Sequence, residues 1–262
     1  MSGIIKRGVK SVGEFTVGLI EELGRLITML VQTVIWTFRP PYRFRIFFQQ
    51  LESVGVGSLP IVLLTGIFAG LVLAYQSDHA FRLFNAETLV GATVAVSLLR
   101  ELGPVFTGLM VAGRTGSAMT TELGTMRVTE QIDAMAVMAV NPIQYLVMPR
   151  VIATILMLPV LNMLFNLVGI GAAYGLSVGY LHTDPGIFVH HITRFVSMQD
   201  ILYSTIKAAV FGLVVGLVGC YKGFYASGGA KGVGEATTSS VVMSSVLILL
   251  LDYMMTTMMW SL

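Results

Sequence analysis

Apolar residues fall into five long runs along this chain. Segments rich in charge, glycine and proline separate the runs, which cover residues 54–76, 89–111, 147–181, 201–221 and 241–260. A helix needs about 20 apolar residues to cross the hydrocarbon core of a bilayer. The pattern therefore predicts an all-α integral membrane protein with five transmembrane helices, and we expect residues 1–262 to form a single domain.

The N-terminal segment, residues 4–38, has a different pattern. Apolar residues recur there at helical spacing, and charged residues such as Lys10, Glu22 and Arg25 lie between them. Its uncharged apolar stretch, residues 26–38, is too short to span a bilayer. We expect an amphipathic helix that lies in the membrane interface and is not removed as a signal peptide.

The composition excludes several classes of protein. Hydrophobic residues make up 55% of the chain and charged residues only 11%, which is too few to cover a soluble domain of this length. Cys220 is the single cysteine, so an intrachain disulfide framework is excluded. No basic stripe for nucleic acid is present, and we expect no nucleic-acid partner.

The positions of Lys and Arg predict the orientation in the membrane. With the N-terminus in the cytoplasm, most of these residues lie on the cytoplasmic side, and only Arg82, Arg194 and Lys207 lie outside. Basic residues favour the cytoplasmic side. We therefore expect the C-terminus outside and the loop at residues 113–146 in the cytoplasm. Since five helices enclose little volume, we also expect a homodimer.

Small residues recur at four-residue spacing in three of the spans. The motifs are Gly66-x-x-x-Gly70, Gly171-x-x-x-Gly175-x-x-x-Gly179 and Gly212-x-x-x-Gly216. Such faces let two helix backbones approach closely. The spacing indicates a tight bundle but leaves open whether the helices meet within one subunit or between subunits.

Motifs of soluble enzymes do not find their structural context here. Residues 175–179 read G-x-S-x-G, but that motif needs a strand, a turn and a helix, and these residues lie in an apolar helix. The glycine-rich residues 228–234 lack the G-x-x-x-x-G-K-[ST] of a phosphate loop. The four histidines lie in outer loops without a recognisable metal-ligand spacing. We expect no catalytic residue, metal, cofactor or ATP site in this chain.

Three charged residues stand out at positions inside the predicted spans where a charge is least favourable. Arg100 and Glu101 fall near the middle of the second span and Asp252 in the fifth. Insertion scales assign about 2.5–3.5 kcal/mol to an Arg or Asp at the centre of a membrane helix. Because neighbouring residues on a helix do not face each other, we predict an ion pair between Arg100 and Asp252, with Glu101 facing a cavity. Two interpretations remain: a structural polar cluster, or the polar floor of a cavity for an amphipathic substrate.

The loop between the second and third spans contains a predicted short helix, residues 129–138. Thr129 can cap it, and Ile132 and Met135 give it an apolar side. Its exposed side needs a binding partner, either the membrane surface or a groove on another protein. Its acidic and methionine side chains favour the protein groove.

Several motifs together carry a family resemblance. They are SLLRELGP at residues 97–104, AGRTGSA at 112–118, ELGTMR at 122–127, TEQIDAM at 129–135 and NP at 141–142. This pattern resembles the MlaE (YrbE) family of ABC transporter permeases, and the resemblance covers essentially the whole chain.

The resemblance implies a homodimeric permease, not an enzyme, that moves phospholipids between the inner membrane of a Gram-negative bacterium and the periplasm. A separate cytoplasmic ATPase would bind ATP, and a periplasmic ring of an MCE-domain protein would pass the lipid onward. A small STAS-domain protein would attend the ATPase. The C-terminus would then be periplasmic.

The resemblance also implies roles for individual residues. Arg100 and Glu101 match a polar pair near the lipid pocket at the dimer interface. The residues expected to contact acyl chains are Leu73, Phe81 and Phe84. The helix at 129–138 matches the coupling helix that docks in the ATPase, and the residues expected to do so are Thr129, Glu130, Gln131, Asp133 and Met135.

Two other functions remain as alternatives. A secondary transporter would need an internal repeat with broken helices, and the two halves of the sequence show no self-similarity. A purely structural membrane subunit would explain the packing glycines but not the cytoplasmic helix.

Overall fold

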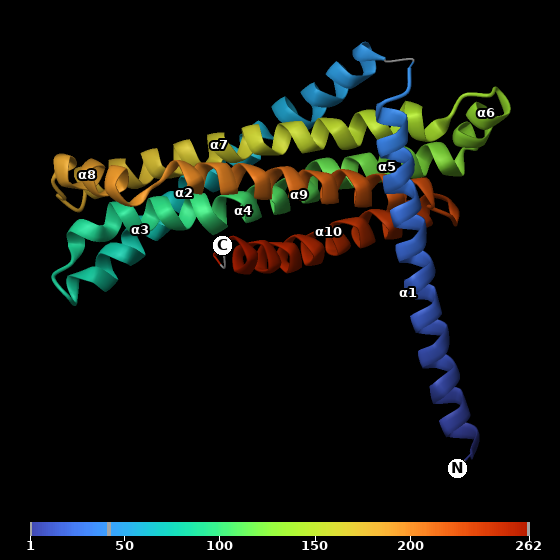
Figure 1. The fold of residues 1–262 in the computed structure, drawn as a ribbon, viewed down its shortest axis with the longest axis horizontal. Coiled ribbons are helices and arrows are strands. Elements are labelled where there is room, and N and C mark those ends of the chain that lie inside the picture. Colours follow the sequence, from blue (N-terminus) through green and yellow to red (C-terminus); the bar gives the residue numbers. More distant parts are fainter. Residues whose placement is uncertain (1, 41–42, 261–262) are drawn as a thin grey trace.

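The computed structural model describes the backbone of residues 2–40 and 43–260, and the side chains of this part apart from residues 2–16, 19 and 260. These residues form helices and no strand (Figure 1). Five helical segments are long and apolar enough to cross a membrane, namely Phe44–Arg82, Glu87–Val128, Ile143–Gly179, Met198–Phe224 and Gly229–Met259. The prediction of an all-α membrane protein with five spans is confirmed.

The first, fourth and fifth crossings are the single helices α2 (Phe44–Arg82), α9 (Met198–Phe224) and α10 (Gly229–Trp260). The second crossing joins several helical pieces end to end: η1 (Glu87–Leu89), α3 (Val90–Ser97), η2 (Leu98–Leu102), α4 (Gly103–Val111), η3 (Ala112–Gly116) and α5 (Ser117–Val128). The third consists of η4 (Ile143–Val147) and α7 (Met148–Gly179). The short helices α6 (Gln131–Val137) and α8 (Pro185–Phe195) lie at opposite ends of the bundle (Figure 1).

The second crossing is longer than its apolar run. Residues 113–146 were expected to be a loop, but η3 and α5 continue the helix through Val128. The reason is tertiary packing, since Met119, Thr120 and Leu123 are buried although the segment as a whole is polar. The second crossing therefore forms one continuous helical body from Glu87 to Val128.

Two of the three glycine motifs are used for packing within the subunit. A side chain at Gly70 would overlap the backbone of Gly169, and one at Gly66 would lie 2.9 Å from the Phe165 carbonyl oxygen. These glycines let α2 pack closely on α7. Gly212 and Gly216 likewise pack α9 against α7, at the backbone of Thr154 and Val151.

Helix α1 (Ser2–Thr37) crosses one end of the bundle steeply and extends away from it (Figure 1). Met29 and Thr33 are buried against the bundle, and Glu22 forms an ion pair with Lys222 of α9. Apolar side chains on its other sides are exposed, including Ile20 and Ile27. This amphipathic helix matches the predicted residues 4–38 closely, and its place in the membrane interface stays a prediction.

Candidate functional site

The second crossing contains a π-helical turn, η2, at the position of Arg100 and Glu101. In this turn the backbone N–H of Gly103 bonds to the carbonyl of Leu98, five residues earlier. Single π-turns inside α-helices occur frequently at functional sites. Pro104 follows at once and has no N–H, so the Arg100 carbonyl lacks its usual donor four residues later.

Lys207 supplies the missing donor. Its ammonium donates to the Arg100 carbonyl at 3.0 Å. It also lies 2.8 Å from Glu101 Oε2, 2.9 Å from Asp252 Oδ1 and 2.7 Å from Thr256 Oγ1. Because an ammonium has three hydrogens, these acceptors share them. Lys207 therefore connects the second, fourth and fifth crossings, with only 3% of its side chain exposed.

Arg100 has a carboxylate partner on α9. Its Nε donates to Asp200 Oδ1 at 2.6 Å. The other oxygen of Asp200 accepts from the backbone N–H of Ser197 at 2.8 Å and from its hydroxyl, while the Asp200 N–H donates back to Ser197 Oγ. This reciprocal capping box begins α9 and holds the Asp200 side chain in place for Arg100.

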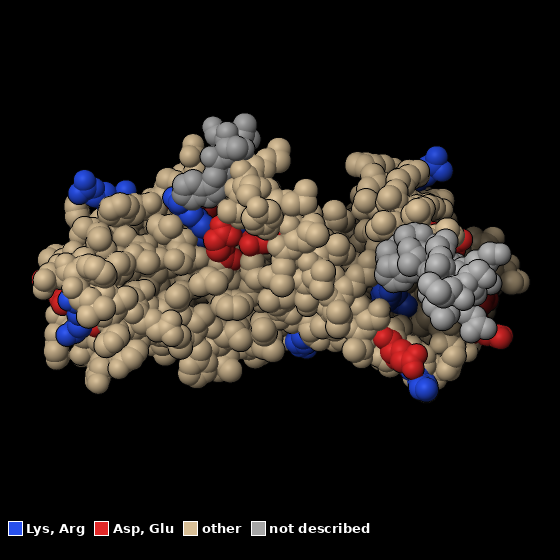
Figure 2. All heavy atoms as spheres, turned by 90° about the horizontal axis from the view of Figure 1, so that it is seen from below, with Lys and Arg blue, Asp and Glu red and all other residues tan. Residues whose placement is uncertain are grey.

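We call Arg100, Glu101, Asp200, Lys207 and Asp252 the charged cluster. Among the described residues it combines three acidic and two basic side chains, so acid is in excess. A hollow of about 270 Å³ opens beside it, and Gln199, Tyr203, Thr256 and Met259 line this hollow together with cluster residues. Arg100 and Glu101 reach its surface, with 27% and 38% of their side chains exposed. Figure 2 shows a place between the two ends of the molecule where acidic and basic atoms meet.

The structure corrects the predicted ion pair between Arg100 and Asp252. Arg100 pairs with Asp200, and Asp252 pairs with Lys207. The prediction was wrong because α9 is rotated so that Lys207 faces the second and fifth crossings, where it pairs with Glu101 and Asp252. A lysine inside the apolar run 201–221 was a signal that could have identified it.

Asp200 was missed for a different reason. It stands at the edge of the fourth apolar run, where a charge is expected to meet water. The Ser-x-x-Asp spacing from Ser197 signalled a helix start there. It did not show that the second crossing places Arg100 beside this helix start.

The predicted acyl-chain residues do not join the charged cluster within one subunit. Leu73 and Phe81 on α2 are half-buried and pack against the apolar core. Phe84 follows the end of α2 and is 78% exposed. None of the three lines the hollow beside Arg100 and Glu101. Their predicted role with lipid remains untested.

The predicted coupling helix is shorter than expected. It comprises Gln131–Val137, and Glu130 directly before it and Ala139 two residues after it have left-handed backbones with φ of 60°. Thr129 does not cap it: the Thr129 hydroxyl donates to the Thr125 carbonyl and Thr129 ends α5 instead. The sharp left-handed residue at Glu130 is what separates α6 from α5.

Helix α6 has one buried face and one exposed face. Ile132 is buried and Met135 half-buried against the end of the bundle. Glu130, Gln131 and Asp133 lie on the exposed side. Asp133 accepts from Arg127 of α5 at 2.6 Å. At its C-terminal end, the residues Val137 and Met138 are 88% and 66% exposed.

A buried arginine connects α5 to the third crossing. Arg150 of α7 is 2.8 Å from Glu122 of α5 and donates to the Leu146 carbonyl. Its side chain is only 4% exposed. The helix α5 is thus joined to η2 through the continuous second crossing and to α7 through this ion pair.

Known proteins match this chain over nearly its whole length. The family model for permease MlaE matches residues 47–258. A "Probable ABC transporter permease protein" of Rickettsia bellii is 41% identical over 94% of this chain and 95% of its own length. The "Intermembrane phospholipid transport system permease protein MlaE" of Haemophilus influenzae is 37% identical over 96% of this chain and 97% of its own. The chain therefore belongs to the MlaE family of ABC transporter permeases.

Proposed function

We propose that this chain is the permease subunit of an ABC transporter that moves phospholipids between the inner membrane and the periplasm. The near full-length match to a permease named for intermembrane phospholipid transport carries this proposal. The charged cluster inside an otherwise apolar bundle supports it, because an amphipathic substrate needs both environments.

In this proposal two copies form a homodimer, with the N-terminus in the cytoplasm and the C-terminus in the periplasm. A cytoplasmic ATPase binds ATP, and this chain binds no cofactor. An MCE-domain ring passes lipid onward in the periplasm, and a STAS-domain protein attends the ATPase. Five crossings per copy enclose little volume, which favours a substrate path between the two copies.

The substrate site centres on Arg100 and Glu101, since these members of the cluster reach its surface. A guanidinium suits a lipid phosphate, and a carboxylate suits an amine or hydroxyl of a headgroup. Leu73, Phe81 and Phe84 contact the acyl chains in this proposal. Lys207 and Asp252 hold Glu101 and η2 in position from behind.

Energy enters through α6 and its flanking residues Thr129 and Glu130. Closure of the ATPase pair pushes the two copies of α6 together. Because α5 belongs to the same continuous helix as η2, the displacement reaches the charged cluster and narrows the space for lipid. The direction of transport depends on when the ring is loaded.

The docking role is tested by Glu130→Arg, which reverses a charge on the exposed start of α6. We expect the ATPase to be lost when the variant permease is purified from membranes, with the permease itself still present. Asp184→Arg, a charge reversal in the exposed residue before α8 at the other end of the bundle, is the control and should keep the ATPase. Unchanged co-purification of Glu130→Arg would refute docking through α6.

The substrate site is tested by Glu101→Leu with a photoreactive phospholipid in the purified complex. We expect less cross-linking to the second crossing without loss of the folded protein, while Glu87→Leu, at the exposed start of that crossing, changes nothing. Undiminished cross-linking would mean that the charged cluster holds the helices together and does not bind the substrate. The two alternative functions predict other results. A secondary transporter would move lipid without an ATPase, and a purely structural subunit would move none.

A further inference from the structure

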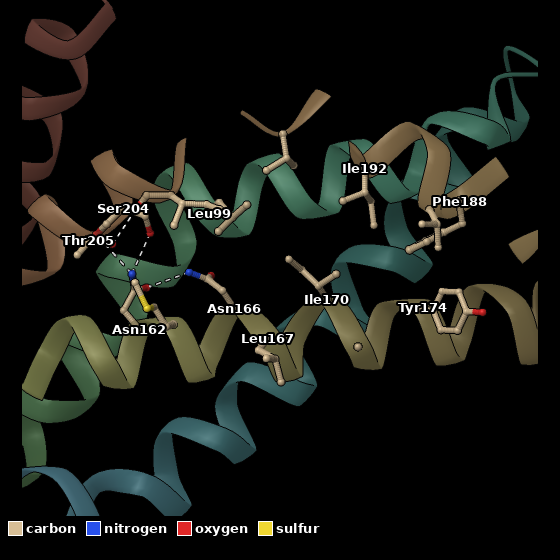
Figure 3. A pocket seen from close by; sticks show the side chains of 15 residues that line it. Leu99, Asn162, Asn166, Leu167, Ile170, Tyr174, Phe188, Ile192, Ser204 and Thr205 are labelled. Atoms are coloured by element: carbon tan, nitrogen blue, oxygen red, sulfur yellow. Dashed lines mark hydrogen bonds between the residues drawn. The ribbon is translucent and has the colours of Figure 1, made fainter. Parts of the chain in front are cut away.

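An apolar groove lies between α7, α8 and α9, outside the site described above. Its volume is about 740 Å³. Figure 3 shows Asn162 and Ser204 at one end and Tyr174 and Phe188 at the other, with Ile170, Leu167 and Ile192 between them. Leu99 of η2 also lines it, so the second crossing separates this groove from the charged hollow.

The polar side chains gather at the Asn162 end of the groove, where most of them are turned toward one another (Figure 3). Asn162 donates to Ser204 Oγ at 2.8 Å, and Asn166 donates to Asn162 Oδ1 at 3.2 Å. The Thr205 hydroxyl donates to the Ile201 carbonyl within its own helix. The groove therefore presents a nearly apolar wall, although polar residues help to line it.

A glycine helps to keep the groove open. A side chain built on Gly171 would meet no atom within 4 Å, in contrast to Gly66 and Gly70 on the packed face of α2. Gly175, one turn further along α7, has equally open surroundings but does not line the groove. The four-residue glycine spacing in this part of α7 thus does not serve packing within the subunit.

We propose that this groove binds one acyl chain of a membrane phospholipid. Both α7 and α9 belong to spans long and apolar enough to cross the bilayer, and the apolar groove between them and α8 is therefore suited to hydrocarbon. Ligand pockets usually measure about 300–1,000 Å³, a range that includes this one. The inference goes beyond the proposed function, because the site holds lipid whether or not the protein transports it.

The bound chain contacts the turn that carries the substrate residues. Leu99 is nearly buried, with 9% exposed, and precedes Arg100 in the π-turn. One face of η2 thus meets the acyl chain, and another meets Lys207 and Asp200. The lipid in this groove supports the position of η2 from the side opposite the charged hollow.

The test uses the full chain in nanodiscs of palmitoyl-oleoyl phosphatidylcholine containing a trace of the same lipid with a diazirine in its acyl chain. After illumination, mass spectrometry maps the labelled residues. We expect strong labelling of Ile170 and Ile192, which are half-buried in the groove, and weak labelling of Leu156 and Val160. Those two residues lie on α7 outside the groove and are about half exposed, so they report ordinary annular lipid.

Gly171→Trp fills the groove and should abolish labelling at Ile170 and Ile192. Gly175→Trp is the matched control and should leave it unchanged. If Gly171→Trp does not fold, Ile192→Trp fills the groove from α8, with labelling at Ile170 as its readout. Equal labelling at Leu156 and Ile170 in the unchanged protein would overturn the proposal in favour of annular lipid. Label absent from the groove but present at Leu156 would overturn it in favour of a protein partner.

Discussion

Two ion pairs of this protein have the same length and opposite surroundings. Arg100 and Asp200 are 2.6 Å apart within the bundle, and Arg127 and Asp133 are 2.6 Å apart at the end that carries α6. The side chain of Asp200 is 6% exposed, whereas that of Asp133 is 58% exposed. Distance alone therefore does not describe what an ion pair contributes.

The surroundings decide the role of each pair. A buried carboxylate that loses its partner leaves an uncompensated charge, whereas exposed partners return to water. The charged cluster holds three crossings together through Lys207. The pair beside α6 leaves the exposed face of that helix available for a partner. Three substitutions, ordered by expected effect, test this contrast.

Lys207→Met should have the largest effect. It removes the positive charge between Glu101 and Asp252 and the donor to the Arg100 carbonyl, so we expect a loss of about 3–5 kcal/mol in unfolding free energy. Reversible unfolding of the purified protein in mixed micelles measures it. The same change in an Asp252→Asn background should cost less, because one orphaned carboxylate is already neutral. Equal costs in both backgrounds would contradict the cluster.

Asp200→Ala should have an intermediate effect. It removes the Arg100 pair and the capping box of α9, and hydrogen bonds to charged groups contribute about 1.5–3 kcal/mol. Asp184→Ala is the matched control, since the exposed Asp184 caps α8 through the Ile187 N–H. The same unfolding measurement should show a larger loss for Asp200→Ala. Equal losses would mean that Arg100 contributes nothing through this pair.

Asp133→Asn should have the smallest effect on stability, about 0–1 kcal/mol, because both partners are exposed. Added salt should reduce even this difference, since the pair is screened. Unfolding at low and high ionic strength measures it. A loss as large as that of Asp200→Ala would erase the distinction between the two regions.

Part of the candidate site could be predicted from the sequence. Arg100, Glu101 and Asp252 stand out because charges inside apolar runs are rare. Pro104 after Arg100 also indicates a carbonyl that needs another donor. Their partners could not be predicted, because each partner lies on a different crossing. Sequence separation carries no information on how two helices are rotated.

The same limit applies to the glycine motifs and the coupling helix. Gly66 and Gly171 both begin four-residue spacings, yet only Gly66 meets another backbone within the subunit. The pattern at 129–138 predicted a short helix with an apolar side. It could not show that the backbone turns left-handed at Glu130, because that conformation is rare for a glutamate.

Hydropathy along the chain was sufficient to predict five crossings, since a bilayer requires each crossing to satisfy its own backbone and to be apolar over its length. Both requirements act within one segment. The contacts of Lys207 with Glu101 and Asp252 join different segments, and they depend on the rotation and depth of three helices. Only the packed bundle decides those, because close contacts at glycines such as Gly70 and Gly216 set how the helices fit together.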